Sequence, residues 1–268
     1  MNESGLTASE LAATRRDLDP IVRPITVNDV NEAWAQGLRD FQTAPAFGLA
    51  FGAFYAAAGI VIAASATALG LSYLTYPLAA GFALIGPFAA VGLYEVSRRL
   101  EARQTLSWRG VFGVIFEQRH RQLAWMALVI LFIFMIWIYS AQLLGALMIG
   151  SRSFATFEDF LVALTTTPEG VLFLLLGNAV GALLSLVVFS LTLVSFPLLL
   201  DRDIDFVTAM ITSVRAIVLS PAPTVGWGFT VAVLLLLGCL PAFLGLIVVL
   251  PILGHATWHL YRKLVVRV

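Results

Sequence analysis

Long apolar stretches alternate along this chain with short charged ones. Four stretches contain no Asp, Glu, Lys or Arg, and they cover residues 41–94, 122–150, 170–200 and 216–261. About 18 apolar residues are enough for a helix to cross the roughly 30 Å hydrocarbon layer of a bilayer. The first and last stretches therefore predict two membrane spans each, and the middle two predict one each. The expected spans are residues 45–70, 76–94, 123–149, 171–200, 225–240 and 242–259.

The boundary between the last two spans falls at Gly238, Cys239, Leu240 and Pro241. A single long helix through this point is the alternative, and the basic residues decide between the two. Of the sixteen Lys and Arg residues, all except Arg152 fall in the termini, in the loop between spans 2 and 3, or in the loop between spans 4 and 5. Basic residues near span ends stay in the cytoplasm. The pattern therefore predicts six spans with both termini cytoplasmic, as in a bacterial inner-membrane protein.

Composition agrees with this assignment. The chain is 60% apolar and 12% charged, whereas soluble domains contain about 25% charged residues. The net charge is zero, so no overall field attracts the chain to nucleic acid, and the expected surroundings are the lipid bilayer. Residues 1–24 are polar and predict a mobile cytoplasmic tail without a signal peptide, followed by a single transmembrane domain over residues 25–268. The lone Cys239 predicts a small buried apolar residue and no disulfide.

An amphipathic stretch precedes each odd-numbered span. The apolar stripes are Val27, Val30, Trp34, Leu38 and Phe41; Trp108, Phe112 and Ile115; and Val207, Met210, Val214 and Val218. Thr26 and Asp29 predict a capping box for the first helix, and Asp203 or Asp205 predicts the N-cap of the third. The chain then contains three units of interfacial helix, span and return span, which is typical of a parallel threefold repeat. The alternative is that such helices are simply common beside membrane spans.

Polar residues inside the spans are few and uncharged in spans 1 to 5, which argues against proton or sodium coupling, although backbone carbonyl sites stay open. The fourth span contains most of them: Asn178, Ser185, Ser190, Thr192 and Ser195. They predict hydrogen bonds between neighbouring helices or, alternatively, a polar lining for a transported molecule. The pairs Gly48/Gly52 and Gly177/Gly181 predict close packing of spans 1 and 4 in the interior of the bundle.

The C-terminal segment is the most distinctive one, and its candidate partner or ligand residues are His255, Trp258, His259, Tyr261 and Arg262. His255 and His259 are four residues apart and share a helix face, but no further metal ligands are evident, so we expect no metal and no cofactor. One interpretation is an interfacial belt, with the Trp258 and Tyr261 rings among the lipid headgroups. The others are a docking site for a partner and a haem or metal site. No nucleophile elbow, phosphate-binding loop or paired-carboxylate motif is present, and we therefore expect no enzymatic activity.

Several motifs together resemble a prokaryotic family of predicted integral membrane proteins, domain of unknown function 2189. The matching residues are 23–25, 34, 37, 40–41, 86–88, 92–99 and 254–263. Some family members are labelled as cytochrome c oxidase subunits, so the resemblance implies a link to a respiratory complex. The chain lacks the buried multi-histidine pattern that haem and copper require, which makes such a role accessory.

The sequence thus predicts an all-α, six-span membrane protein with interfacial helices. The leading function is a non-enzymatic accessory protein that associates with a larger membrane complex such as a respiratory oxidase. A small-molecule or lipid carrier with a polar path along the fourth span is the first alternative. A haem- or metal-binding membrane protein is the second.

Overall fold

A computed structural model describes residues 20–68, 90–116, 121–150 and 157–267, and these residues form helices without named strands. Residues 90–101 form a helix. The other helices are α2 (Val27–Thr43), α3 (Pro45–Ala68), α5 (Trp108–Phe116), α6 (Arg121–Met148), α7 (Phe157–Thr166), α8 (Pro168–Thr192), α9 (Ser195–Asp201), α10 (Phe206–Leu219), α11 (Pro221–Cys239) and α12 (Leu246–Leu264). The predicted all-α class is confirmed.

Four segments of the described chain are long and apolar enough to cross a membrane: Pro45–Ser65, Gln122–Met148, Pro168–Asp201 and Pro221–Cys239. They correspond to the predicted spans 1, 3, 4 and 5. Most of the predicted span 2 lies outside the described residues. α12 occupies the position of span 6 but ends in Arg262 and Lys263 and is not among the four. The count of six spans therefore stays a prediction.

The predicted break after α11 is confirmed. α11 ends at Cys239 and α12 begins at Leu246, so the single long helix is excluded. The chain reverses between them through Ala242 and Phe243, whose φ angles of 49° and 66° lie in the left-handed region. Residues other than glycine rarely adopt this backbone conformation, and it is incompatible with a right-handed helix. The helix therefore cannot continue through Ala242 and Phe243.

Each predicted amphipathic stretch is a helix that directly precedes a candidate span: α2 before α3, α5 before α6, and α10 before α11. The capping box at Thr26 and Asp29 is confirmed, and Asp205 caps α10 by accepting a hydrogen bond from the Thr208 amide at 2.9 Å. Three residues of the apolar stripe of α10, Val207, Val214 and Val218, are exposed, whereas Met210 packs against the core. The buried face of α10 contains Ala209, Thr212, Ser213, Ala216 and Ile217. The helix order thus recurs three times, whereas the threefold repeat itself stays a prediction.

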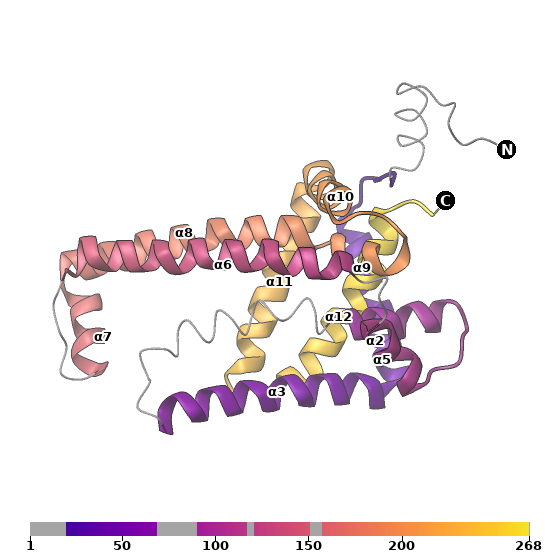
Figure 1. Cartoon of the computed structure of the whole chain (residues 1–268), viewed down its shortest axis with the longest axis horizontal. Helices are drawn as coiled ribbons and strands as arrows, with labels where there is room; N and C mark the ends of the chain where they lie inside the picture. Colours follow the sequence, from indigo (N-terminus) through magenta and orange to yellow (C-terminus); the bar gives the residue numbers. More distant parts are fainter. Residues whose placement is uncertain (1–19, 69–89, 117–120, 151–156, 268) are drawn as a thin grey trace.

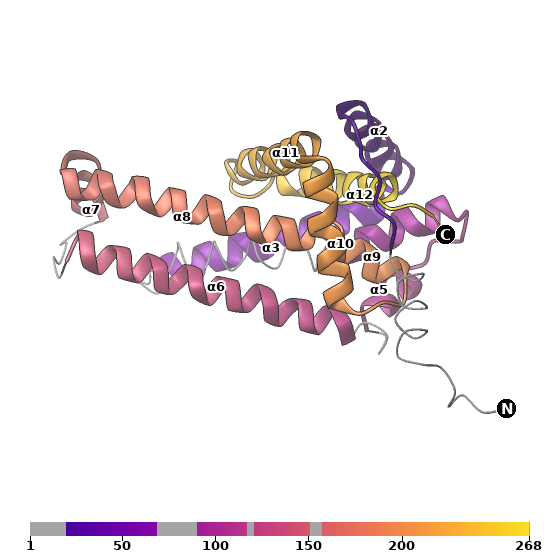
Figure 2. The ribbon, with the colours of Figure 1, turned by 90° about the horizontal axis from the view of Figure 1, so that it is seen from above.

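α6 and α8 lie side by side and antiparallel, with α7 at one end of the pair (Figures 1 and 2). The predicted interior position of the fourth span is wrong, because none of the apolar window of the Pro168–Asp201 span is buried. A side chain added at Gly177 would meet no neighbour within 4 Å, and one at Gly181 would touch only the Trp137 ring of α6.

α12 lies at the centre of the remaining helices, in contact with α2, α3 and α11. Gly48 and Gly52 of α3 allow the closest approach, because a side chain at Gly52 would overlap the backbone of Ile247, and one at Gly48 would lie 3.1 Å from the Pro251 Cβ. Close packing of the first span is therefore confirmed. Gly37 of α2 allows a similar approach to the backbone of Ala256. Two glycine-mediated contacts fix α12 between α2 and α3.

Candidate functional site

The last three turns of α12 bring the predicted C-terminal residues together, but inside the protein. The side chains of His255 and Trp258 are 0% exposed and that of Tyr261 is 1% exposed. The interpretation of Trp258 and Tyr261 as a belt among lipid headgroups is therefore wrong. The small residues Gly254 and Ala256 explain the burial, because they let Leu93 and Gly37 of neighbouring helices approach the α12 backbone.

Both histidines of α12 have a polar neighbour on another helix. The Nδ1 atom of His255 lies 2.8 Å from the Ser97 hydroxyl on the helix over residues 90–101. The Nε2 atom of His259 lies 2.7 Å from a carboxylate oxygen of Asp40 on α2. The described residues include no group of three or more His, Cys, Asp or Glu side chains placed to hold a metal ion. The remaining nitrogen of His255, Nε2, is buried without a hydrogen-bond partner among them.

Trp258, Tyr261 and Arg262 connect α12 to two further elements. The Trp258 indole donates to Glu101 at 3.2 Å, and the Tyr261 hydroxyl donates to Asp201, the last residue of α9, at 2.7 Å. Arg262 contacts both carboxylates, at 2.9 Å from Asp201 and 3.3 Å from Glu101. Burial, and then the adjacent Asp201 carboxylate, raise the pKa of the Tyr261 hydroxyl. It therefore remains protonated and serves as a donor.

Lys263 and the segment before α2 add further contacts between the C-terminal residues and the rest of the chain. The Lys263 ammonium pairs with Glu32 and lies 3.5 Å from Asp29, both on α2. Val22 forms an antiparallel bridge with Val265, and the Arg23 amide donates to the Leu264 carbonyl at 2.9 Å. The described end of the predicted tail, residues 20–24, is thus held against the C-terminal segment. We call His255, Trp258, His259, Tyr261, Arg262 and Lys263, with these partners, the α12 polar cluster.

A buried carboxylate stands beside this cluster. The Glu95 side chain is 0% exposed and accepts hydrogen bonds from Arg98 at 2.7 Å and from Arg99 at 2.6 Å. A buried charge is tolerated only when it is paired and hydrogen-bonded, and the two guanidinium groups meet that condition. The sequence patterns did not predict a role for Glu95, Ser97 or Glu101. The i, i+3 and i+4 spacing of Glu95, Arg98 and Arg99 in the sequence would have predicted these ion pairs on a helix.

The predicted polar residues of the fourth span do not form one lining. Asn178 and Ser185 are exposed, Ser190 and Thr192 are half-buried, and Ser195 is buried. Asn178, Thr192 and Ser195 each donate to a backbone carbonyl four residues earlier. Of the five predicted residues, only Asn178 and Ser185 therefore lie on the outer surface of α8.

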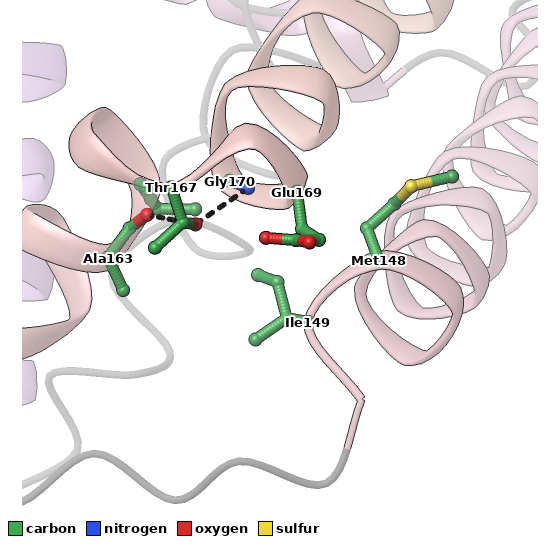
Figure 3. Close-up of a pocket in the computed structure, with 7 residues that line it drawn as sticks. Met148, Ile149, Ala163, Thr167, Glu169 and Gly170 are labelled. Carbon is green, nitrogen blue, oxygen red and sulfur yellow. Dashed lines mark hydrogen bonds between the residues drawn. The ribbon is translucent and has the colours of Figure 1, made fainter.

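A small hollow with a volume of about 10 Å³ lies where α7 meets α8 (Figure 3). Thr167 forms its floor, donating to the Ala163 carbonyl at 2.7 Å and accepting from the Gly170 amide at 3.1 Å as the N-cap of α8. Pockets for small molecules usually enclose about 300–1,000 Å³. The hollow is smaller, and its threonine is already used to start a helix.

Residues 75–201 match the model of a family described as "Predicted integral membrane protein (DUF2189)". The resemblance that the sequence motifs indicated is confirmed over this segment. The matched segment includes α6 and α8. It also includes Ser97, Glu101 and Asp201, which contact residues of α12, and the buried Glu95. No curated protein and no solved structure matches the chain.

Proposed function

We propose that this integral membrane protein, related to the DUF2189 family over residues 75–201, is a non-enzymatic accessory protein that docks laterally on a larger membrane complex. The observation that carries the proposal is a polar stripe on the outer surface of α8. Asn178, Ala182 and Ser185 are exposed and follow one another at i, i+4 and i+7, so they share one helix face.

The stripe lies at the depth of the hydrocarbon layer. Asn178 and Ser185 are roughly 15 Å and 25 Å along the axis from Pro168, where α8 begins. Lipid tails offer no hydrogen-bond partner to an amide or a hydroxyl at that depth. Another transmembrane helix does, and small residues such as Ala182 let its backbone come close. The stripe is therefore better suited to a protein partner than to lipid alone.

The rest of the structure supplies a scaffold for this surface. α6 and α8 pack against each other, and the α12 polar cluster connects α2, α9, α12 and the helix over residues 90–101. A respiratory oxidase is the complex that the resemblance implies. The carrier and the haem or metal protein stay alternatives without a comparable observation in their favour.

A crosslinking experiment in native membranes tests the proposal. A photoreactive amino acid replaces Ala182 in one variant and Leu237, an exposed apolar residue of α11, in a control variant. We expect position 182 to give one crosslinked protein of constant mass, identified by mass spectrometry, and position 237 to give none. Asn178→Leu in the Ala182 variant should remove the product. A protein that crosslinks only to lipid at position 182 and purifies alone from mild detergent would contradict the proposal.

A further inference from the structure

α5 packs against the start of α3 through two aromatic contacts. The Trp108 ring lies 4.1 Å from the Phe47 ring, centroid to centroid, and the Phe112 ring lies 5.5 Å from the Phe51 ring. The candidate span that contains both α3 residues begins at Pro45. A helix rises about 1.5 Å per residue, which puts Phe47 about 3 Å and Phe51 about 9 Å beyond that start. α5 therefore lies at the level where headgroups meet acyl chains, the usual depth of an interfacial helix.

The two aromatic residues of α5 also face outward. Val111 and Val114 are buried, whereas Trp108 is 43% exposed and Phe112 is 41% exposed. The two exposed rings stack on each other at 5.9 Å with an interplanar angle of 19°. Tryptophan is enriched at this depth in membrane proteins because its ring is apolar while its N–H is polar. The outer face of α5 thus has the composition of a membrane-boundary surface.

Two arginines close to these aromatic residues in the chain have no acidic partner among the described residues. Arg103, in the turn after the helix over residues 90–101, and Arg109, in the first turn of α5, are both exposed. Neither pairs with Asp or Glu in the part of the chain that the structure describes. Arg99 nearby behaves differently, because Glu95 and the carbonyls of Thr105 and Gly110 hold its guanidinium group. Arg103 and Arg109 are therefore exposed cations without a carboxylate partner in the described part of the chain.

We propose that Arg103, Trp108, Arg109 and Phe112 form a docking surface for the headgroups of anionic phospholipids. The aromatic pair sets the depth, and the two guanidinium groups stand beside it, where phosphodiester groups lie. Guanidinium binds phosphate through two parallel hydrogen bonds, which an ammonium group does not match. The net negative charge of an anionic lipid adds an attraction that a zwitterionic lipid lacks. The surface belongs to the chain itself, so it does not depend on the lateral docking proposed for α8.

Quenching of Trp108 by brominated lipids tests this assignment. The full-length protein is reconstituted into bilayers that contain brominated phosphatidylglycerol or brominated phosphatidylcholine at the same mole fraction. The Trp108→Phe variant isolates the contribution of Trp108 from that of the other tryptophans. We expect both lipids to quench Trp108 and phosphatidylglycerol to be preferred, by about fivefold for each arginine at low ionic strength.

The double variant Arg103→Gln/Arg109→Gln should lose the preference for phosphatidylglycerol and keep the quenching of Trp108 by phosphatidylcholine. Arg39→Gln is the matched control, since Arg39 is an exposed arginine on α2 that bonds only within its own helix. It should leave the preference unchanged. Native helix content and elution volume establish that each variant is folded, and Arg109→Lys, which preserves the charge, provides a milder change with partial loss. Equal quenching by the two lipids, no quenching of Trp108 by either, or a preference that survives in the double variant would overturn the proposal.

Discussion

Around α12, charged and polar side chains find their partners on other helices, whereas the polar residues in the middle of α8 bond to their own helix or face outward. His259 and Asp40 are 219 positions apart in the chain, and Trp258 and Glu101 are 157 apart. Asn178 of α8 donates to Leu174, only four residues away. The hydrogen bonds of the first region thus join distant segments of the chain, whereas that of Asn178 stays within one helix.

Glycine shows the same difference. Gly52 of α3 faces the backbone of α12 without room for a methyl group, but Gly177 of α8 faces open space. The two regions therefore differ in how tightly their helices are packed. The helices around α12 leave little space between their backbones, whereas none of the apolar window of the Pro168–Asp201 span is buried. The same substitution made in each of the two regions should therefore change the free energy of unfolding by different amounts.

Glu95→Gln should have the largest effect. It removes a fully buried carboxylate that accepts from Arg98 and Arg99, and breaking a buried ion pair lowers the free energy of unfolding by about 3–5 kcal/mol. Glu169→Gln on the exposed first turn of α8 should change it by less than about 1 kcal/mol. Thermal unfolding of the purified variants in one detergent measures both. Equal shifts of the unfolding midpoint would remove the distinction between the regions.

Gly52→Ala should have the second largest effect. The added methyl group overlaps the Ile247 backbone and separates α3 from α12, which lowers the free energy of unfolding by about 1–3 kcal/mol. Gly177→Ala adds the same group to open space and should stabilise α8 by about 0.5–1 kcal/mol, because alanine is the better helix former. The two variants are therefore expected to shift the unfolding midpoint in opposite directions. A stabilising Gly52→Ala would show that α12 is not packed as described.

Local pattern was enough to predict the helices but not what they touch. The candidate spans, the three amphipathic helices and the caps at Thr26 and Asp205 depend on residues within a few positions of one another, and they were predicted correctly. The burial of α8 was predicted wrongly from Gly177 and Gly181. Glycine spacing describes one helix face and carries no information about whether another helix covers it.

The C-terminal residues were singled out from sequence, but their surroundings were not. Trp258 and Tyr261 have the composition of an interfacial belt, since aromatic rings precede basic residues. Their hydrogen-bond partners inside the protein, Glu101 and Asp201, belong to distant segments. Sequence periodicity cannot reveal such pairs, because the positions are more than fifty residues apart and follow no common repeat.

Tyr261→Phe tests the hydrogen bond to α9 by itself. The ring stays in place, while Asp201 loses a donor at 2.7 Å, which should lower the free energy of unfolding by about 1.5 kcal/mol. The matched change is Tyr139→Phe on α6, where the tyrosine is exposed. It should shift the unfolding midpoint little. A neutral Tyr261→Phe would mean that Arg262 alone satisfies Asp201.

Thr26→Ala and Thr167→Ala compare the N-caps of α2 and α8, and their effects should be the smallest. Thr26 starts the helix that pairs with Lys263, so its loss should lower the free energy of unfolding by about 1 kcal/mol at pH 7. Thr167 starts a helix whose apolar window is not buried. Its loss should therefore increase amide hydrogen exchange in the first turn of α8 with a smaller change in the midpoint. Exchange measured by mass spectrometry separates the two responses.

The pH dependence sharpens this last comparison. Hydrogen bonds from the Thr26 backbone and then its side chain lower the pKa of Asp29 below its ordinary value of 3.8. Because the folded-state pKa is the lower one, the contribution of Asp29 is complete above about pH 4 and is lost as the pH falls through the folded-state value. The destabilisation by Thr26→Ala should therefore shrink at pH 3, since part of what the threonine supports is already lost. That of Thr167→Ala should stay constant, because its bonds to Ala163 and Gly170 involve only backbone groups. Unfolding midpoints at the two pH values decide this, and a constant Thr26→Ala effect would show that the Asp29 carboxylate contributes nothing to the cap.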